Sequence, residues 1–183
     1  MEGLEVWKTL IEGVFLIEPK VFGDTRGFFF ESYTKKKYGL TGIDVDFVQD
    51  NHSKSSQGVL RGLHYQISKP QDKLVRVTQG MVFDVAVDIR KNSPTFGHWV
   101  GFILSEQNML QLFVPKGFAH GFCVLSEKAE FLYKCSDYYF PEDEGGIIWD
   151  DPDLNVNWPI KDPRLSEKDK KYPRLKDIFD LNS

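Results

Sequence analysis

The chain has 183 residues, of which 41% are hydrophobic and 27% charged. These values are typical of a folded globular protein and exclude a chain-wide disordered or low-complexity polypeptide, and residues 1–183 are expected to form a single domain. The formal net charge of -4 argues against binding to a nucleic-acid backbone, which needs an excess of Lys and Arg on one surface.

Short apolar or alternating runs, separated by turn residues, make up most of the chain from Val14 onward. Such runs predict β-strands rather than long amphipathic helices. Strands are expected at residues 13–18, 27–33, 47–53, 59–66, 74–79, 82–90, 98–104, 111–114, 120–125, 130–137 and 146–149. Short helices are expected at residues 33–38 and in the tail, where Leu175, Ile178 and Leu181 recur at helical spacing. The pattern predicts an all-β sandwich or barrel.

Cysteine usage and hydropathy indicate the cellular setting. Cys123 and Cys135 stand in apolar runs without metal-binding spacing, so we expect both to be small core residues. No apolar run approaches the roughly 20 residues that a membrane-spanning helix needs. We therefore expect no membrane partner and a cytoplasmic location.

The expected strand at 59–66 carries polar groups on both faces. Strict alternation divides its residues into two sets, Leu60, Gly62, His64 and Gln66 against Arg61, Leu63 and Tyr65. In a closed or sandwiched sheet one face points inward, so a His or an Arg is placed where desolvation matters.

The expected strand at 82–90 carries an acidic face. Asp84 and Asp88 alternate with Phe83, Val85 and Val87, which lie on the opposite face. Antiparallel sheets commonly expose one face to water. We therefore expect Asp84 and Asp88 to lie on a solvated face.

The chain contains four histidines, His52, His64, His98 and His120, none of them in a His-x-His pair. Such a pair lets one strand present two metal ligands. Its absence disfavours a metal site and favours metal-free acid/base chemistry.

Three candidate residues each have a structural alternative. His64 fits a hydrogen-bonded structural histidine as well as a base, and Tyr133 fits a core tyrosine. Asp169 closes the run Ser166-Glu167-Lys168-Asp169, which fits the capping-box pattern at the start of a helix. Local sequence alone leaves both interpretations open.

Several longer segments occur in a fixed order: residues 22–29 (FGDTRGFF), 47–53 (FVQDNHS), 60–66 (LRGLHYQ), 73–77 (KLVRV) and 115–122 (PKGFAHGF). Together with Tyr133-Lys134 and residues 146–151 (GIIWDD), they closely resemble the dTDP-4-dehydrorhamnose 3,5-epimerase family. The resemblance runs from about Val14 to Asp169. It implies a cupin-type jelly roll with short peripheral helices, working as a homodimer without metal or organic cofactor.

The resemblance also implies a reaction. The substrate would be a dTDP sugar with a ketone at C4, epimerised at C3 and C5 through enolates in dTDP-L-rhamnose biosynthesis. His64 matches the family's base, Asp169 the carboxylate paired with it, and Tyr133 the acid that supplies a proton at C5. Lys73 matches the position near the C4 oxygen, where a fixed positive charge stabilises the enolate.

The residues that match the family's nucleotide-sugar contacts are Arg26, Glu31, Gln49, Asp50, Asn51, Arg61, Lys73, His120, Tyr139, Glu144 and Lys168. Tyr139 and Phe28 are candidates to stack on thymine. Two alternatives stay open: a single-carbon epimerase or ketoisomerase of a related sugar, and a binding module without catalysis. Tyr133 favours reaction at C5, and a binding module would be expected to lack His64, Lys73 or Tyr133.

Overall fold

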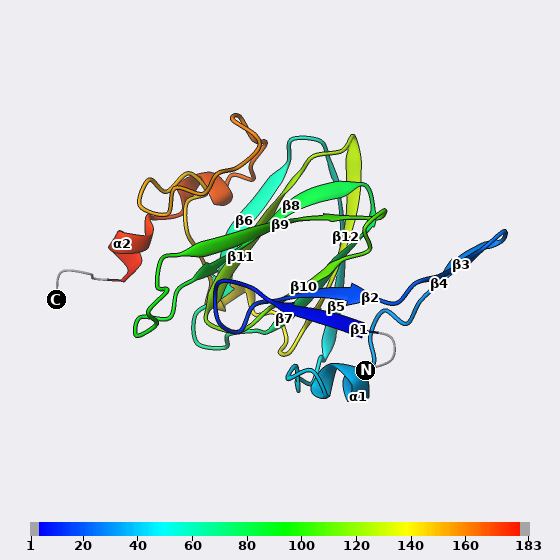
Figure 1. Cartoon of the computed structure of the whole chain (residues 1–183). Helices are drawn as coiled ribbons and strands as arrows, with labels where there is room; N and C mark the ends of the chain where they lie inside the picture. The colour runs from blue at the N-terminus through cyan, green and yellow to red at the C-terminus, as the bar shows by residue number, and fades with distance from the viewer. Residues whose placement is uncertain (1–3, 180–183) are drawn as a thin grey trace.

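A computed structural model describes residues 4–179 as two antiparallel sheets and a separate hairpin (Figure 1). The six-stranded sheet has the order β1 (Leu4–Lys8), β2 (Phe15–Pro19), β10 (Gln111–Val114), β7 (Lys73–Gln79), β12 (Lys128–Cys135) and β5 (Gln49–Ser56). The five-stranded sheet has the order β13 (Glu144–Gly146), β6 (Leu60–Gln66), β11 (Phe118–Val124), β8 (Met81–Asp88) and β9 (Trp99–Ser105). The prediction of an all-β jelly roll is confirmed.

The predicted peripheral helices are present and short. They are α1 (Lys35–Gly39) and α2 (Leu175–Ile178). Two 3₁₀ turns, η1 (Pro141–Asp143) and η2 (Asp169–Lys171), accompany them. Leu175 and Ile178 of the predicted tail helix lie in α2, whereas Leu181 falls outside the described residues. Over residues 4–179, no helix combines the length and apolar character that crossing a membrane requires.

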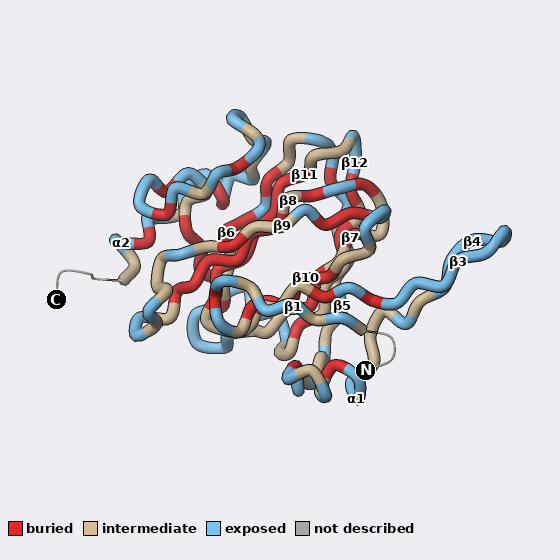
Figure 2. Tube along the Cα trace, viewed as in Figure 1, coloured by how far each residue is buried: buried red, intermediate tan, exposed pale blue. Residues whose placement is uncertain are grey.

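The main core lies between the two sheets, whose buried strands run through the centre of the molecule in Figure 2. It combines apolar side chains of β7, β10 and β12 with those of β8 and β11, including Val75, Leu112, Phe131, Ala86 and Phe122. Phe122 and Phe131 of this core also line a cavity between the sheets, so the core borders it directly.

A second apolar cluster covers the outer face of the five-stranded sheet. Leu60 and Leu63 of β6 pack there with Ile147, Trp158 and Leu175 from the C-terminal segment. The backbone of Arg164 exchanges hydrogen bonds with the neighbouring segment: the Leu60 N–H donates to its carbonyl oxygen at 3.0 Å. The C-terminal segment is therefore fixed against β6 and carries η2 to that strand.

The hairpin of β3 (Phe22–Asp24) and β4 (Gly27–Phe29) projects away from both sheets and is exposed along its length (Figures 1 and 2). Phe22, Phe28 and Phe29 are 55%, 63% and 71% exposed. The sequence pattern predicted one strand over 27–33 here and did not predict β1, an edge strand in which Glu5 and Lys8 are both exposed. In a short edge strand with charged residues, the alternation of apolar and polar side chains is too brief to predict a strand.

The prediction of a solvated acidic face on β8 is wrong. Asp84 and Asp88 are both fully buried. Asp84 lies against His120, and Asp88 accepts hydrogen bonds from Arg90, Ser93 and Thr95. Each buried carboxylate is satisfied by specific donors, which alternation alone does not reveal. Cys123 and Cys135 are free and buried, as predicted.

Candidate active site

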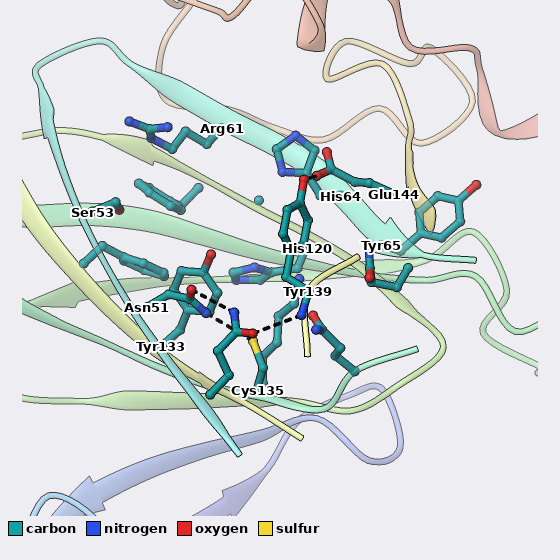
Figure 3. Close-up of a pocket in the computed structure, with 17 residues that line it drawn as sticks. Asn51, Ser53, Arg61, His64, Tyr65, His120, Tyr133, Cys135, Tyr139 and Glu144 are labelled. Atoms are coloured by element: carbon teal, nitrogen blue, oxygen red, sulfur yellow. Dashed lines mark hydrogen bonds between the residues drawn. The ribbon is translucent and has the colours of Figure 1, made fainter. Parts of the chain in front are cut away.

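A cavity of about 350 Å³ opens between the two sheets (Figure 3). Nine of the residues singled out from the sequence line it: Gln49, Asn51, Arg61, His64, Lys73, His120, Tyr133, Tyr139 and Glu144. They come from β5, β7 and β12 of one sheet, from β6, β11 and β13 of the other, and from the loop after β12. The cavity is therefore walled by both sheets.

His64 stands on β6 with its imidazole against the carboxylate of Asp169, which η2 supplies. The distance from His64 Nε2 to Asp169 Oδ1 is 2.6 Å, and the Asp169 side chain is only 4% exposed. An ionised carboxylate accepts hydrogen bonds only, so Nε2 carries the proton of this contact and Nδ1 is left as the basic nitrogen. The pair has the arrangement of a general base held by a carboxylate.

The capping interpretation of Asp169 describes half of the local structure. The Asp169 backbone N–H donates to Ser166 Oγ at 3.1 Å, as in a capping box. The Asp169 carboxylate, however, points to His64 instead of returning to the start of the turn. Its backbone and side chain therefore have separate partners.

Arg61 shares the cavity with His64, although strict alternation placed them on opposite faces. The sheet register pairs His64 with His120 but Arg61 with Phe122, so β6 spans this interval with one residue more than β11. A β-bulge of this kind re-aims the side chains on either side of it. Gly62 adopts a φ of +133°, and a Cβ there would lie 2.6 Å from the Gly121 Cα, so the close approach requires glycine.

Lys73 enters the cavity from β7. Burial lowers the pKa of its ammonium, and nearby Cys135, Glu144 and Asp84 oppose this shift. Cys135 is its cross-strand partner in the sheet. A partly desolvated cation of this kind interacts strongly with negative charge that develops beside it.

Tyr133 lies on β12, so its side chain comes from the sheet that faces the His64 strand. Burial raises the pKa of its phenol, with a further contribution from Cys135. The phenol therefore stays protonated at neutral pH and can donate a proton.

His120 forms a second carboxylate–imidazole pair in the cavity wall. Its Nε2 lies 2.9 Å from Asp84 Oδ1, and its side chain is 8% exposed. His120 is directly opposite His64 in the pairing of β11 with β6. The two imidazoles therefore share one wall.

Glu144 connects the rim of the cavity to the C-terminal segment. Its carboxylate accepts a hydrogen bond from the Tyr139 hydroxyl at 2.5 Å and one from the Tyr172 hydroxyl at 2.7 Å, and it pairs with Lys168. Burial by itself would raise the pKa of Glu144, but these donors outweigh it and lower that pKa to about 2. The same contact raises the pKa of Tyr139 to about 12.

Four of the sequence-predicted binding residues lie outside the cavity lining. Lys168 contacts the site through its ion pair with Glu144, and Asp50 pairs with Lys134 at 2.8 Å, beside a second cavity of about 320 Å³. Arg26 and Glu31 lie on and just after the projecting hairpin, where they pair with Asp24 and Lys37. Phe28, a candidate for thymine stacking, is on the same hairpin.

Among residues 4–179, no three His, Cys, Asp or Glu side chains are grouped so that they could hold a metal ion. His64 and His120 are instead each paired with a carboxylate, and Glu144 is held by Tyr139, Tyr172 and Lys168.

The sequence profile of the dTDP-4-dehydrorhamnose 3,5-epimerases matches residues 8–177. The chain belongs to this family. A dTDP-4-dehydrorhamnose 3,5-epimerase of Pseudomonas aeruginosa is 59% identical over 169 residues, which are 91% of this chain and 93% of the relative.

Solved structures agree with this assignment. The dTDP-6-deoxy-D-glucose-3,5-epimerase of Legionella pneumophila, in complex with dTDP-4-keto-L-rhamnose, superposes with a TM-score of 0.92 at 53% identity, covering 98% of this chain and 95% of that one. A 3'-monoepimerase of Streptomyces bikiniensis, in complex with dTDP-quinovose, gives 0.87 at 32% identity, covering 94% and 90%. The fold of the 3,5-epimerases is thus shared by an enzyme named as an epimerase of a single carbon.

Sequence reasoning did not assign Tyr172, Asp84 or Gly121 to the site, although all three contribute to it. Asp84 carried a usable signal, a carboxylate between apolar residues on both sides in its strand. Tyr172 carried none, because its partners are distant in sequence.

Proposed function

We propose that this chain, acting as a single domain, epimerises C3 and C5 of dTDP-4-dehydro-6-deoxy-D-glucose to give dTDP-4-dehydro-L-rhamnose. The observation that carries the proposal is one cavity with the His64–Asp169 pair on one sheet and Tyr133 and Lys73 on the other. A base, an opposed acid and a fixed cation are the groups that the reaction needs.

The chemistry follows from the C4 ketone, because protons at C3 and C5 are both α to it. Removing either proton leaves an enolate whose charge develops on the C4 oxygen. Lys73 is proposed to face that oxygen, since a cation stabilises the enolate more than the neutral ketone and so lowers the barrier.

His64 is proposed as the base, with Nδ1 accepting the carbon-bound proton. The imidazolium formed is stabilised by the adjacent Asp169 carboxylate, 2.6 Å from Nε2. Inversion also requires a proton from the opposite face, because return from the same face restores the starting sugar. Tyr133, on the facing sheet and protonated at neutral pH, is proposed to supply it at C5.

Binding of the nucleotide is proposed to use the remaining polar groups of the cavity. Arg61 suits the pyrophosphate because its planar guanidinium makes paired, charge-assisted hydrogen bonds. Tyr139, at the rim, is the candidate for stacking on thymine. The enzyme is proposed to act without metal or organic cofactor and without nucleic-acid or membrane partners.

A homodimer is proposed as the working unit. Arg26 and Phe28 match family binding positions yet lie on a hairpin that leaves its own body, 87% exposed in the case of the Arg26 side chain. We propose that in the dimer this hairpin extends to the partner's cavity. We further propose a cytoplasmic location and a role in dTDP-L-rhamnose supply for cell-surface polysaccharide such as O-antigen.

The test is to incubate the enzyme with dTDP-4-dehydro-6-deoxy-D-glucose and to assign the product by ¹H NMR coupling constants. Inversion at both C3 and C5 supports the proposal. Inversion at one carbon supports the alternative, a single-carbon epimerase, and a shifted keto group supports a ketoisomerase. Tyr133→Phe is expected to impair inversion at C5 while leaving proton abstraction intact.

A further inference from the structure

Tyr172 stands immediately after η2, beside the His64 imidazole. Its ring and the imidazole meet edge to face, with centroids 5.7 Å apart and an interplanar angle of 65°. Its hydroxyl donates to Glu144 Oε1 at 2.7 Å. The tyrosine thus touches the imidazole with its ring and is tethered at its far end.

The chain is shaped locally to admit this ring. Gly146 pairs with His64 across β13 and β6, and a Cβ on Gly146 would lie 2.4 Å from Tyr172 Cζ. Any side chain there would displace the tyrosine. Glu144 lies two residues earlier on β13 and so projects from the same face, which places its carboxylate at the end of the ring.

One short turn delivers both contacts to His64. Asp169 is the first residue of η2, and Tyr172, three residues after Asp169, directly follows the turn. In a 3₁₀ turn, residues three apart lie nearly above one another. Asp169 therefore holds the Nε2 edge of the imidazole while Tyr172 packs against the ring.

We propose that Tyr172 is a positioning residue for His64: anchored by Glu144, its ring keeps the imidazole in the orientation in which Nε2 faces Asp169 and Nδ1 faces the sugar. The inference rests on the proposed function, in which His64 is the base. The Asp169 contact by itself would let the His64 imidazole rotate about its hydrogen bond at Nε2. Packing of the Tyr172 ring against the imidazole removes that freedom. Burial and Glu144 also raise the pKa of the Tyr172 phenol, so the tether persists at neutral and moderately alkaline pH.

The kinetic test compares Tyr172→Leu and Tyr172→Phe with Lys171→Ala. Lys171 is a control in the same turn, and within residues 4–179 its exposed side chain makes no hydrogen bond or ion pair with His64 or Tyr172. We expect Tyr172→Leu to lower kcat about 10-fold or more and to change KM less than about 3-fold, because misplacing a catalytic group by a fraction of an ångström slows the chemical step. Tyr172→Phe, which keeps the ring and loses the tether, should lower kcat about 3-fold, and Lys171→Ala should match wild type.

A spectroscopic measurement separates positioning from general destabilisation. Long-range ¹H–¹⁵N NMR of the His64 ring should show one Nε2–H tautomer in the wild type, and a mixture or broadened signals in Tyr172→Leu. If Tyr172→Leu does not fold, Tyr172→Phe decides the question. Wild-type kcat together with wild-type His64 signals in a folded Tyr172 variant would overturn the inference, while failure of the wild type to invert the sugar would instead overturn the proposed function.

Discussion

Replacing Asp169 with Asn removes one negative charge from behind His64 and leaves the size of the side chain unchanged. Asp169 Oδ1 lies 2.6 Å from His64 Nε2, and the Asp169 side chain is 4% exposed. Unit charges ~4 Å apart at an effective dielectric constant of ~20 attract by ~4 kcal/mol. If the amide keeps a neutral hydrogen bond worth ~1 kcal/mol, ~3 kcal/mol of imidazolium stabilisation is lost.

That loss corresponds to a decrease in rate of roughly 100- to 200-fold, at 1.36 kcal/mol for each factor of ten. The assay is deuterium uptake at C3 and C5 of the keto sugar in deuterated water, followed by ¹H NMR. Glu167→Gln is the matched control, because it makes the same carboxylate-to-amide change at an exposed position two residues away, where the partner is Lys170. An Asp169→Asn rate within about threefold of wild type would refute the reasoning and leave Asp169 as a structural residue of the turn.

Two further predictions follow from the buried charges. Burial lowers the pKa of Lys73, so as pH rises its ammonium loses its proton below the ordinary value of 10.5, and kcat should fall in that range. Lys73→Arg should move this fall to higher pH. A profile of kcat against pH that is unchanged in Lys73→Arg would argue against the role assigned to Lys73. Burial would raise the pKa of Asp88, but hydrogen bonds from Arg90, Ser93 and Thr95 lower it from 3.8 to about 2. Its stabilising contribution is therefore present above pH 3.8 and is lost as pH falls through about 2. Asp88→Asn should reduce the free energy of unfolding at pH 7 by about 2 kcal/mol. The melting temperature should fall by roughly 4–8 °C, measurable by calorimetry, and an unchanged value would contradict the assigned network.

The strands could be predicted from the sequence where alternation or a continuous apolar run is strong. Residues 111–114 were expected as a strand with the same bounds that β10 has. The pattern was misleading where pairing between distant strands decides the outcome. Arg61 and His64 share the cavity because of a bulge against β11, and the extra residue is visible only in the register of the two strands.

The site likewise divides into residues that local motifs predicted and residues whose partners are distant in the sequence. His64, Lys73 and Tyr133 were predicted together through long motifs in strands, and the fold brings all three to one cavity. Local sequence could not decide between a cap and a catalytic partner for Asp169, because its imidazole partner lies 105 residues away. Asp84 was misplaced for a related reason, since the imidazole that pairs with its buried carboxylate belongs to His120 on another strand.

The central claim, that one enolising centre acts on both carbons, is tested most directly by comparing the wild type with His64→Ala in deuterated water. The account predicts that the wild type incorporates deuterium at C3 and at C5 of dTDP-4-dehydro-6-deoxy-D-glucose with inversion at each, and that folded His64→Ala incorporates it at neither. Label at only one carbon in the wild type, or retained exchange at either carbon in His64→Ala, would contradict it.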